Sequence, residues 1–296
     1  MLKQKVYMNK EINSNGFGYV DLNLPSGTLW AWKNVGAASP DESGLYFQWG
    51  DTQGYTADQV GTRRGQKNFS SYGYKWNPSG DGSAFTKYIT EGAKLELMDD
   101  AAHINMGGDW HMPTPKQIRE LINETDNTWT TQDGVNGRLF TSKNNGKSIF
   151  FPAAGYASGG SLYDVGDEAD VWSSALGMGS ACSGRYLSFD SYNVNLRRSY
   201  RYYGFSVRGV LDKSLGHKHF EPFQKVLIKE WFNSKSLWVP ALYSYYNAEN
   251  NRHYVIGGKW AKNEHIIPYE GNKYKVGKSE NNDGNNVNNI DVYPYM

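Results

Sequence analysis

The chain has 296 residues, with 31 Lys or Arg against 30 Asp or Glu, so its formal net charge is +1 at pH 7. This balance gives no electrostatic reason to expect nucleic acid as a partner. The single cysteine, Cys182, excludes an internal disulfide framework and a cysteine-based zinc cluster. No apolar run approaches the roughly 20 residues of a membrane-spanning helix, so we expect no membrane insertion.

Residues 1–16 form a lead-in segment with a basic residue or two but no apolar signal-peptide core. We therefore expect the protein to be made in a cytoplasm and, if it leaves the cell, to leave as part of a larger particle. The 33 Gly and 22 Tyr favour a loop-rich α+β or β fold.

Residues 16–32 predict a strand, a turn and a second strand. Pro25 suits the second position of a turn, and Gly27 relieves the tight conformation that follows. Residues 36–92 are rich in glycine, serine and aromatics and only weakly periodic. We expect that region to be held by two buried tryptophans, Trp49 and Trp76.

Two helices are predicted in the middle of the chain. The first begins near Asp99 and ends at the glycines at 107–108. The second is predicted over residues 115–123, because Thr114 is a good N-cap and Gln117 completes a Thr-x-x-Gln capping box. Proline at the first helical position and an apolar i, i+3, i+4 face support the same helix.

Short strands are expected after the second helix, at residues 138–141, 148–151, 171–174, 186–189 and 204–210. The sequence Asn144-Asn145-Gly146 predicts a hairpin turn between the first two. Residues 17–211 thus predict one compact α+β domain, with two helices against small antiparallel sheets.

The character of the sequence changes after residue 211, and we interpret residues 212–296 as a small β-rich domain, or an attachment or oligomerisation segment. Residues 219–243 are apolar-rich and predict a short helix followed by a strand. Hairpins are expected over 252–277, turning at 257–258 and 270–272, and residues 279–289 are a low-complexity linker or loop.

Residues 185–201 concentrate large polar and aromatic side chains of the kinds that recognition surfaces use. The alternative is an ordinary amphipathic strand pair with a solvated face, because alternation points Leu187 and Phe189 one way and their neighbours the other. The three closely spaced arginines and the tyrosines exceed what a solvated face requires. The candidate ligand-binding residues are Arg185, Tyr186, Asp190, Tyr192, Asn193, Asn195, Arg197, Arg198, Tyr200 and Arg201.

A series of motifs occurs in a fixed order along residues 17–210: Tyr19-Val20-Asp21-Leu22, Leu24-Pro25-Ser26-Gly27-Thr28-Leu29-Trp30, Asp99-Asp100-Ala101-Ala102-His103, Gly107-Gly108-Asp109-Trp110-His111-Met112-Pro113-Thr114, Phe151-Pro152-Ala153-Ala154-Gly155-Tyr156, Trp172-Ser173-Ser174 and Tyr203-Gly204-Phe205-Ser206-Val207-Arg208. With them, this part of the chain resembles the Fibrobacter succinogenes major paralogous domain, which is abundant in gut Bacteroidetes and their phages. Position 111 is usually Arg in such domains and is His here. The resemblance does not cover residues 212–296.

The resemblance implies a C-type-lectin-like fold of the formylglycine-generating-enzyme branch. In that branch the stretch before the final Gly-Phe-Ser-Val-Arg motif looks like the ligand-facing surface, and related phage and bacterial proteins diversify it with retroelements; here it corresponds to residues 185–201. Formylglycine-generating enzymes hold copper with a pair of active-site cysteines, which Cys182 alone cannot supply. The Glu-Pro-Asn and Gln-Pro-Asp tripeptides of calcium-dependent sugar-binding lectins are also missing from the sequence.

Two groups of potential metal ligands have plainer explanations. A solvated loop is favoured over a calcium site for the four acidic residues within 164–170. For Asp99-Asp100-x-x-His103, an N-capping aspartate and a histidine packed beside the glycines are favoured over a metal site. The other histidines have no Ser, Cys or paired carboxylate in a recognisable arrangement. We therefore expect no catalytic residues, no metal and no cofactor.

These observations predict a non-enzymatic phage virion surface protein, a fibre or decoration component, that binds a host surface glycan or protein through its lectin-like domain. Residues 212–296 are expected to contact other virion proteins, and the chain is expected to form a homo-oligomer. Two alternatives stay open. One is a bacterial cell-surface or secreted binding protein of the same fold, and the other is a purely structural virion assembly protein in which residues 185–201 pack against neighbouring subunits.

Overall fold

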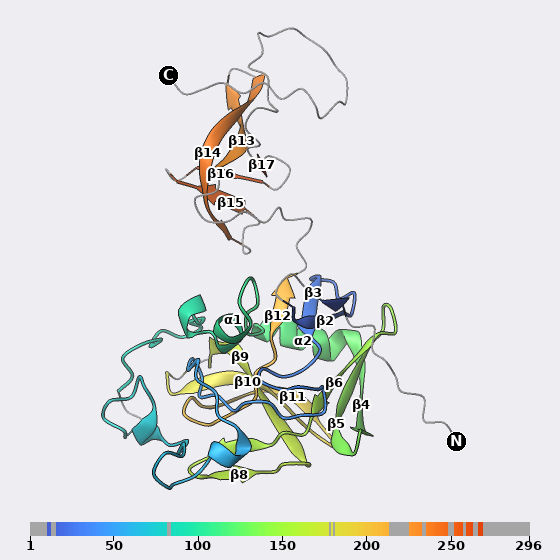
Figure 1. Cartoon of the computed structure of the whole chain (residues 1–296), viewed down its shortest axis with the longest axis vertical. Coiled ribbons are helices and arrows are strands. Elements are labelled where there is room, and N and C mark those ends of the chain that lie inside the picture. Colours follow the sequence, from blue (N-terminus) through green and yellow to red (C-terminus); the bar gives the residue numbers. More distant parts are fainter. Residues whose placement is uncertain are drawn as a thin grey trace. The chain divides into compact units, whose positions relative to one another are not determined.

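The computed structural model describes residues 11–12, 16–81, 84–177, 179, 181–212, 225–232, 235–247, 252–256, 259–262 and 266–268 (Figure 1). The chain divides into two compact units, Met1–Lys213 (unit 1) and Ser214–Met296 (unit 2). Across the described residues antiparallel sheets predominate and two α-helices accompany them, which is compatible with an α+β or a β-rich class. No helix in this part of the chain is long and apolar enough to span a membrane.

The first and last described strands of unit 1 lie in one sheet. In sheet order its strands are β1 (Glu11–Ile12), β2 (Gly18–Asp21), β3 (Thr28–Ala31) and β12 (Val210–Asp212). The turn between β2 and β3 closes where the Gly27 N–H donates to the Leu24 carbonyl at 2.8 Å, with Gly27 at a φ of 74°. That left-handed conformation favours glycine. The strand, turn and strand predicted for residues 16–32 are therefore confirmed.

The strand predicted over residues 204–210 is wrong for most of its length. Only Val210 belongs to a sheet strand, β12. Gly204, Phe205 and Ser206 instead form isolated bridges to Ala157, Phe47 and Val171, respectively. Because each bridge reaches a different segment, this stretch ties three parts of unit 1 together rather than extending one sheet.

The weakly periodic region predicted at residues 36–92 contains no sheet strand among its described residues. It holds two short 3-10 helices, η1 (Ala57–Gln59) and η2 (Ser71–Gly73), and a third, η3 (Leu97–Asp99), follows it. Trp49 is fully buried, as predicted, and its Nε1 donates to the Ser173 carbonyl at 2.9 Å. Trp76 is only half-buried and packs edge-on against Trp49, with 6.4 Å between ring centroids.

Both predicted helices are confirmed: α1 (Ala101–Met106) and α2 (Pro115–Glu124). Asp100 caps α1, its Oδ1 accepting from the His103 N–H at 3.0 Å. Thr114 caps α2, where its Oγ1 accepts from the Gln117 N–H at 3.3 Å and Gln117 Oε1 accepts from the Thr114 N–H at 2.8 Å. These reciprocal bonds satisfy donors that the first helical turn leaves without partners.

Two further sheets are built from hairpins. The larger consists of β4 (Thr125–Gln132), β5 (Val135–Ser142) and β6 (Ser148–Pro152), and the smaller of β7 (Tyr156–Ser158) and β8 (Ser161–Tyr163). The predicted turn at residues 144–146 joins β5 to β6, with the Gly146 N–H bonded to the Ser142 carbonyl at 3.0 Å and Gly146 at a φ of 71°. Strand β4, which follows α2 directly, was not predicted, because its sequence is polar on both faces.

A third sheet of unit 1 has the strand order β11-β10-β9, from β9 (Glu168–Leu176), β10 (Ser183–Asp190) and β11 (Val194–Tyr200). On one face Leu187 packs with Ile118 of α2, which lies alongside these strands (Figure 1). On the other face Trp172 stacks on Phe205, with 4.1 Å between ring centroids. The sheet is therefore enclosed by two hydrophobic clusters, with β11 at its edge.

The described part of unit 2 is a five-stranded antiparallel sheet in the order β16-β15-β14-β13-β17. Its strands are β13 (Lys225–Phe232), β14 (Lys235–Asn247), β15 (Arg252–Val255), β16 (Trp260–Ala261) and β17 (Ile266–Pro268). The helix predicted early in residues 219–243 is wrong for the described part, because β13 pairs there with both β14 and β17. The turns predicted at 257–258 and 270–272, the linker at 279–289 and most of the lead-in lie outside the described residues.

Candidate ligand-binding surface

The β10–β11 hairpin carries nine of the ten predicted site residues, and its turn is held by one carboxylate. Asp190 Oδ1 accepts hydrogen bonds from the backbone N–H groups of Tyr192 at 2.6 Å and Asn193 at 2.7 Å. Burial acts to raise the pKa of Asp190, but these N–H groups outweigh it and hold that pKa below its usual value. The turn is thus fixed locally, while the Tyr192 side chain is 90% exposed at its tip.

The register of the hairpin divides the predicted residues between two faces. Leu187 pairs with Leu196 and lies on the face covered by α2. Since alternate residues of a strand point to opposite faces, the pair Arg185–Arg198 shares that face. The pair Tyr186–Arg197 lies on the opposite one, with Asn195. The predicted residues therefore do not form the single displayed face that the sequence indicated.

Strand β10 itself departs from the predicted alternation. Leu187 and Phe189 are buried, as expected, but Tyr186 and Ser188 on the supposed solvated face are buried as well. The reason is that β10 is the central strand of its sheet, between β9 and β11. The amphipathic pattern read from the sequence is wrong for this strand, and surface residues of the hairpin come from the turn and from β11.

Two of the predicted ligand-binding residues belong to the protein interior. Tyr186 is 8% exposed and packs on Trp172 and Phe205, with ring centroids 5.9 Å and 4.7 Å away. Burial, followed by the charge of Asp170, raises the pKa of its hydroxyl. Arg201 is fully buried. Neither side chain is available at the surface to a ligand.

Arg201 instead fastens the end of β11 to surrounding loops. Its Nε donates to the Tyr74 hydroxyl at 2.9 Å, and its Nη1 and Nη2 donate to the carbonyls of Ala181 at 2.9 Å and Lys87 at 3.0 Å. The guanidinium also lies over the Trp49 ring, 4.8 Å from its centroid. The exposed members of the predicted set are therefore Tyr192, Asn193, Asn195, Arg197, Arg198 and Tyr200, with Arg185 and Asp190 half-buried.

Tyrosines that adjoin the hairpin form a group with Tyr200, and of this group only Tyr200 was predicted as a site residue. Tyr200 stacks on Tyr202, with centroids 5.1 Å apart and an interplanar angle of 11°. Tyr203 contacts both of them edge-on and stacks on Tyr156 at 6.0 Å, which in turn stacks on Tyr163 at 5.4 Å. These rings come from β7, β8, the last residue of β11 and the turn that follows it, so only the folded chain brings them together.

Next to these tyrosines lie two carboxyl groups of β9. Asp170 is 4% exposed, and its Oδ1 is buried without a hydrogen-bond partner. Burial, followed by the negative charge of Glu168, raises the pKa of Asp170 well above its usual value, and Arg197 partly opposes this. Glu168 Oε1 accepts from the Ser188 hydroxyl at 2.9 Å. The solvated loop favoured for these acidic residues fits Asp164 and Asp167 but not the two strand residues.

The other candidate metal group also resolves into structural contacts. Asp100 caps α1 and also accepts from the Met112 N–H at 2.8 Å, whereas Asp99 pairs with Lys75 at 3.0 Å and with Lys87 at 2.6 Å. Within the ranges that the structure describes, no three His, Cys, Asp or Glu side chains are grouped so that they could hold a metal ion.

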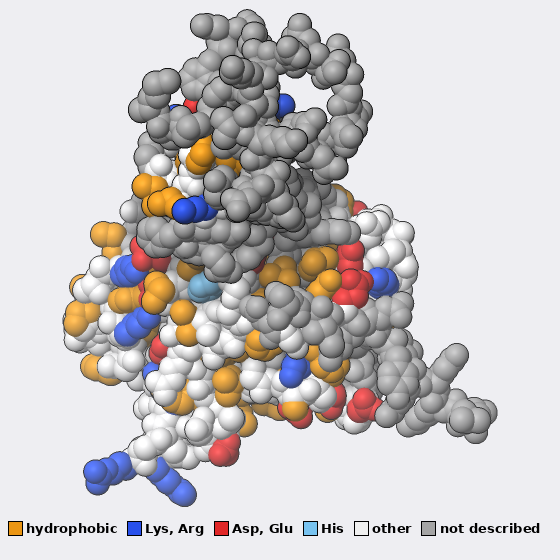
Figure 2. Space-filling view, turned by 45° about the horizontal axis from the view of Figure 1, so that its top comes forward, with side chains coloured by type: hydrophobic (Ala, Val, Ile, Leu, Met, Phe, Trp, Pro, Cys, Tyr) orange, Lys and Arg blue, Asp and Glu red, His pale blue; other side chains and the backbone are white. Residues whose placement is uncertain are grey.

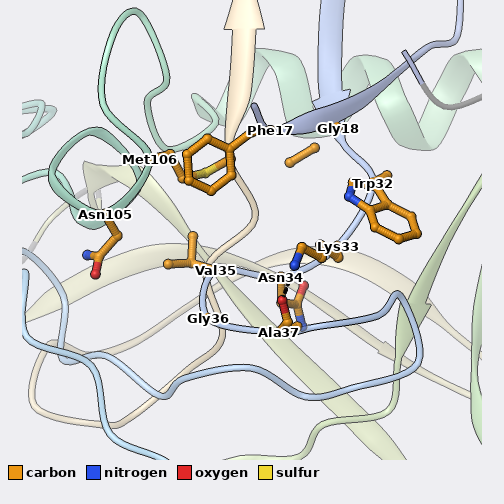
Figure 3. A pocket seen from close by; sticks show the side chains of 11 residues that line it. Phe17, Gly18, Trp32, Lys33, Asn34, Val35, Gly36, Ala37, Asn105 and Met106 are labelled. Carbon is orange, nitrogen blue, oxygen red and sulfur yellow. Dashed lines mark hydrogen bonds between the residues drawn. The ribbon is translucent and has the colours of Figure 1, made fainter. Parts of the chain in front are cut away.

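Unit 1 also contains a pocket of about 220 Å³ that was not predicted and that no residue of the hairpin lines (Figure 3). Phe17, Trp32 and Met106 supply apolar walls. Its polar groups already have internal partners: Asn34 accepts from Arg208 Nε at 2.8 Å, and Asn105 donates to the Ala101 carbonyl at 2.7 Å. The pocket therefore offers a ligand little polar recognition, and the hairpin remains the better candidate.

Charge is not gathered on one side of the visible surface. On the face drawn in Figure 2, acidic and basic side chains are scattered among hydrophobic ones.

Comparison with known proteins adds no relative: no family model, curated protein or solved structure matches the chain.

Proposed function

We propose that the chain is a non-enzymatic recognition protein whose unit 1 is a C-type-lectin-like domain that binds a surface glycan or protein through the β10–β11 hairpin. One observation carries the proposal. Six exposed Tyr, Asn and Arg side chains lie on a turn and an edge strand whose ends are fixed by Asp190 and Arg201. In the setting we favour, the protein lies on the surface of a phage virion and the bound partner belongs to the bacterial host.

The chemistry of the hairpin supports binding. Tyr and Arg are enriched at binding hot spots, because they bring large contact areas and several donors at a moderate loss of side-chain freedom. A hairpin held before the ligand arrives loses less conformational entropy on binding. The Asp190 turn and the buried Arg201 guanidinium supply this preorganisation, and the adjoining tyrosine group enlarges the aromatic surface.

In this proposal, unit 2 attaches the protein to the particle. Its sheet has its own hydrophobic cluster, which includes Val226, Ile228 and Val255. A unit with its own core can serve as an attachment domain. We propose that it contacts other virion proteins or promotes homo-oligomer formation, so that unit 1 is held on the particle.

Two alternatives make different predictions for the same surface. A bacterial cell-surface or secreted protein would use the hairpin in the same way, without a particle. A structural virion protein would bury the hairpin against a neighbouring subunit, because Tyr and Arg also favour protein interfaces.

A cryo-EM map of the native particle separates these functions. The proposal predicts that the exposed side chains of the turn and β11 face solvent in the particle and that unit 2 contacts the particle. Burial of residues 192–200 against a neighbouring subunit would overturn host recognition in favour of assembly. Recovery of the protein in a bacterial surface fraction and in no particle would favour the bacterial alternative.

A further inference from the structure

Two arginines share the α2-covered face of the β10–β11 hairpin, and a third belongs to α2 itself. Arg185 of β10 lies directly opposite Arg198 of β11. Residues opposite each other on one face of an antiparallel pair have side chains in contact range, and like charges there are unfavourable. The third residue, Arg119, is an exposed residue of α2, which packs against this face through Ile118.

Arg185, at the centre of this group, has no acidic partner among the residues that the structure describes. Burial, followed by the positive charges of Arg119 and Arg198, lowers the pKa of the Arg185 guanidinium. Asp and Glu do not contribute to that shift. Arg185 makes no hydrogen bond or ion pair with any described residue, and its Nε is buried without a partner. The half-buried Arg185 guanidinium thus has donors without described acceptors and feels two other positive charges. An anion bound there would satisfy the donors and offset the repulsion.

We propose that Arg119, Arg185 and Arg198 form an oxyanion-binding site, which accepts a sulfate, carboxylate or phosphate group carried by the ligand of the hairpin. The planar guanidinium suits such groups, because its parallel N–H donors match two oxygens at once. The proposal rests on the proposed recognition function and narrows its ligand to an anionic saccharide. Sulfate esters and uronate carboxylates share the required chemistry.

The first test uses inorganic sulfate and the full chain. Sodium sulfate is compared with sodium chloride at equal ionic strength, and the rise in Tm is measured for wild type, Arg119→Gln and Arg64→Gln. Arg64 is an exposed arginine of another loop, so its variant loses the same charge without touching the site. We expect the sulfate-specific rise to be lost in Arg119→Gln and kept in Arg64→Gln. Equal rises in all three proteins would indicate general salting-out and would overturn the site.

The second test identifies the source of the anion. Binding of the full chain to a sulfated galactan, to polygalacturonate and to an uncharged galactan is measured for the same proteins and for Arg185→Gln. We expect wild type to prefer one charged polymer over the uncharged one by about tenfold to a hundredfold, as charge-assisted hydrogen bonds allow. The preferred polymer reports sulfate or carboxylate. A preference that survives in both Arg119→Gln and Arg185→Gln would contradict the site.

The two proposals fail in different ways. If Tyr192→Ala abolishes ligand binding while Arg119→Gln leaves the preference for charged polymers intact, the hairpin function stands and the oxyanion site falls. If Arg119→Gln removes sulfate binding while Tyr192→Ala changes no binding property, the site stands and the hairpin function falls. Tyr192 is 90% exposed, so its substitution is not expected to disturb folding.

Discussion

The Arg201 guanidinium donates through Nε to the Tyr74 hydroxyl at 2.9 Å, and both side chains are buried. This bond joins the end of β11 to the loop that carries η2, and the carbonyls of Tyr88, Ala181 and Lys87 accept the remaining bonds. An arginine at the end of the displayed strand thus serves as its internal anchor. The surface proposed to bind ligand depends on this contact for its position.

Replacement of this anchor is expected to cost stability. Arg201→Leu leaves the Tyr74 hydroxyl and three carbonyls without their donor inside the protein. Buried polar groups that lose a charged partner destabilise strongly, so we expect the free energy of unfolding to fall by about 3 kcal/mol. Urea unfolding of Arg201→Leu and of the exposed-site control Arg64→Leu measures this. Equal stability of the two variants would show that Arg201 is not an anchor.

Asp170 predicts a pH dependence of stability. Because its folded pKa is raised, mainly by burial, its neutral form stabilises the fold fully only below the unfolded pKa. That contribution is lost as the pH rises through the folded pKa. Asp170→Asn keeps the shape of the neutral acid and cannot ionise. We expect the variant to match wild type near pH 4 and to become the more stable protein at pH 8, in urea unfolding at both pH values. A difference that does not change with pH would contradict this account.

The pair of His111 and Asp212 gives a second pH dependence of stability, which is smaller and lies in a different pH range. Its Nε2 lies 3.5 Å from Asp212 Oδ2. Burial acts to lower its pKa, but the hydrogen bond and charge of Asp212 outweigh it and raise that pKa. A raised histidine pKa gives stability that is present below the unfolded pKa, about 6.5, and lost as the pH rises through the folded pKa. We expect the free energy of unfolding of wild type to exceed that of His111→Gln by more at pH 5.5 than at pH 8.5, measured by urea unfolding.

The size of that effect should stay below about 1 kcal/mol, because the Asp212 side chain is 45% exposed and solvent screens the pair. The matched control is His111→Arg. Since arginine stays charged throughout this range, its pair with Asp212 should show no loss between pH 5.5 and 8.5. If His111→Arg and wild type change equally with pH, the pair is not the source of the dependence.

Features set by neighbouring residues were predictable from the sequence. The α2 capping box spans only Thr114 to Gln117, and the turn at Gly27 depends on its own backbone conformation, so both could be assigned from local pattern. The β13 strand shows the limit of that approach. Its apolar run is compatible with a helix or a strand. The strand forms because β13 pairs with β14 and β17, which come later in the sequence and which a local pattern does not reveal.

The residues of the candidate site also divide into those that local sequence predicts and those that it does not. The exposed side chains of the turn and β11, such as Tyr192 and Asn195, follow from residue type and position. The burial of Tyr186 depends on Phe205, and that of Arg201 depends on the loop around Tyr74. Such contacts between distant segments cannot be recognised in the local sequence. The buried Arg201 therefore could not be distinguished from the exposed Arg197 and Arg198 that precede it.

Binding of the full chain to intact Bacteroidetes cells tests the central claim most directly. The triple variant Tyr192→Ala, Arg198→Ala, Tyr200→Ala is compared with wild type and with the control Tyr72→Ala, Arg64→Ala, which removes an exposed tyrosine and an exposed arginine elsewhere in unit 1. Loss of hot-spot residues predicts at least about a tenfold weaker binding for the triple variant, with the control equal to wild type. Binding by the triple variant as strong as that of wild type would contradict recognition through the β10–β11 hairpin.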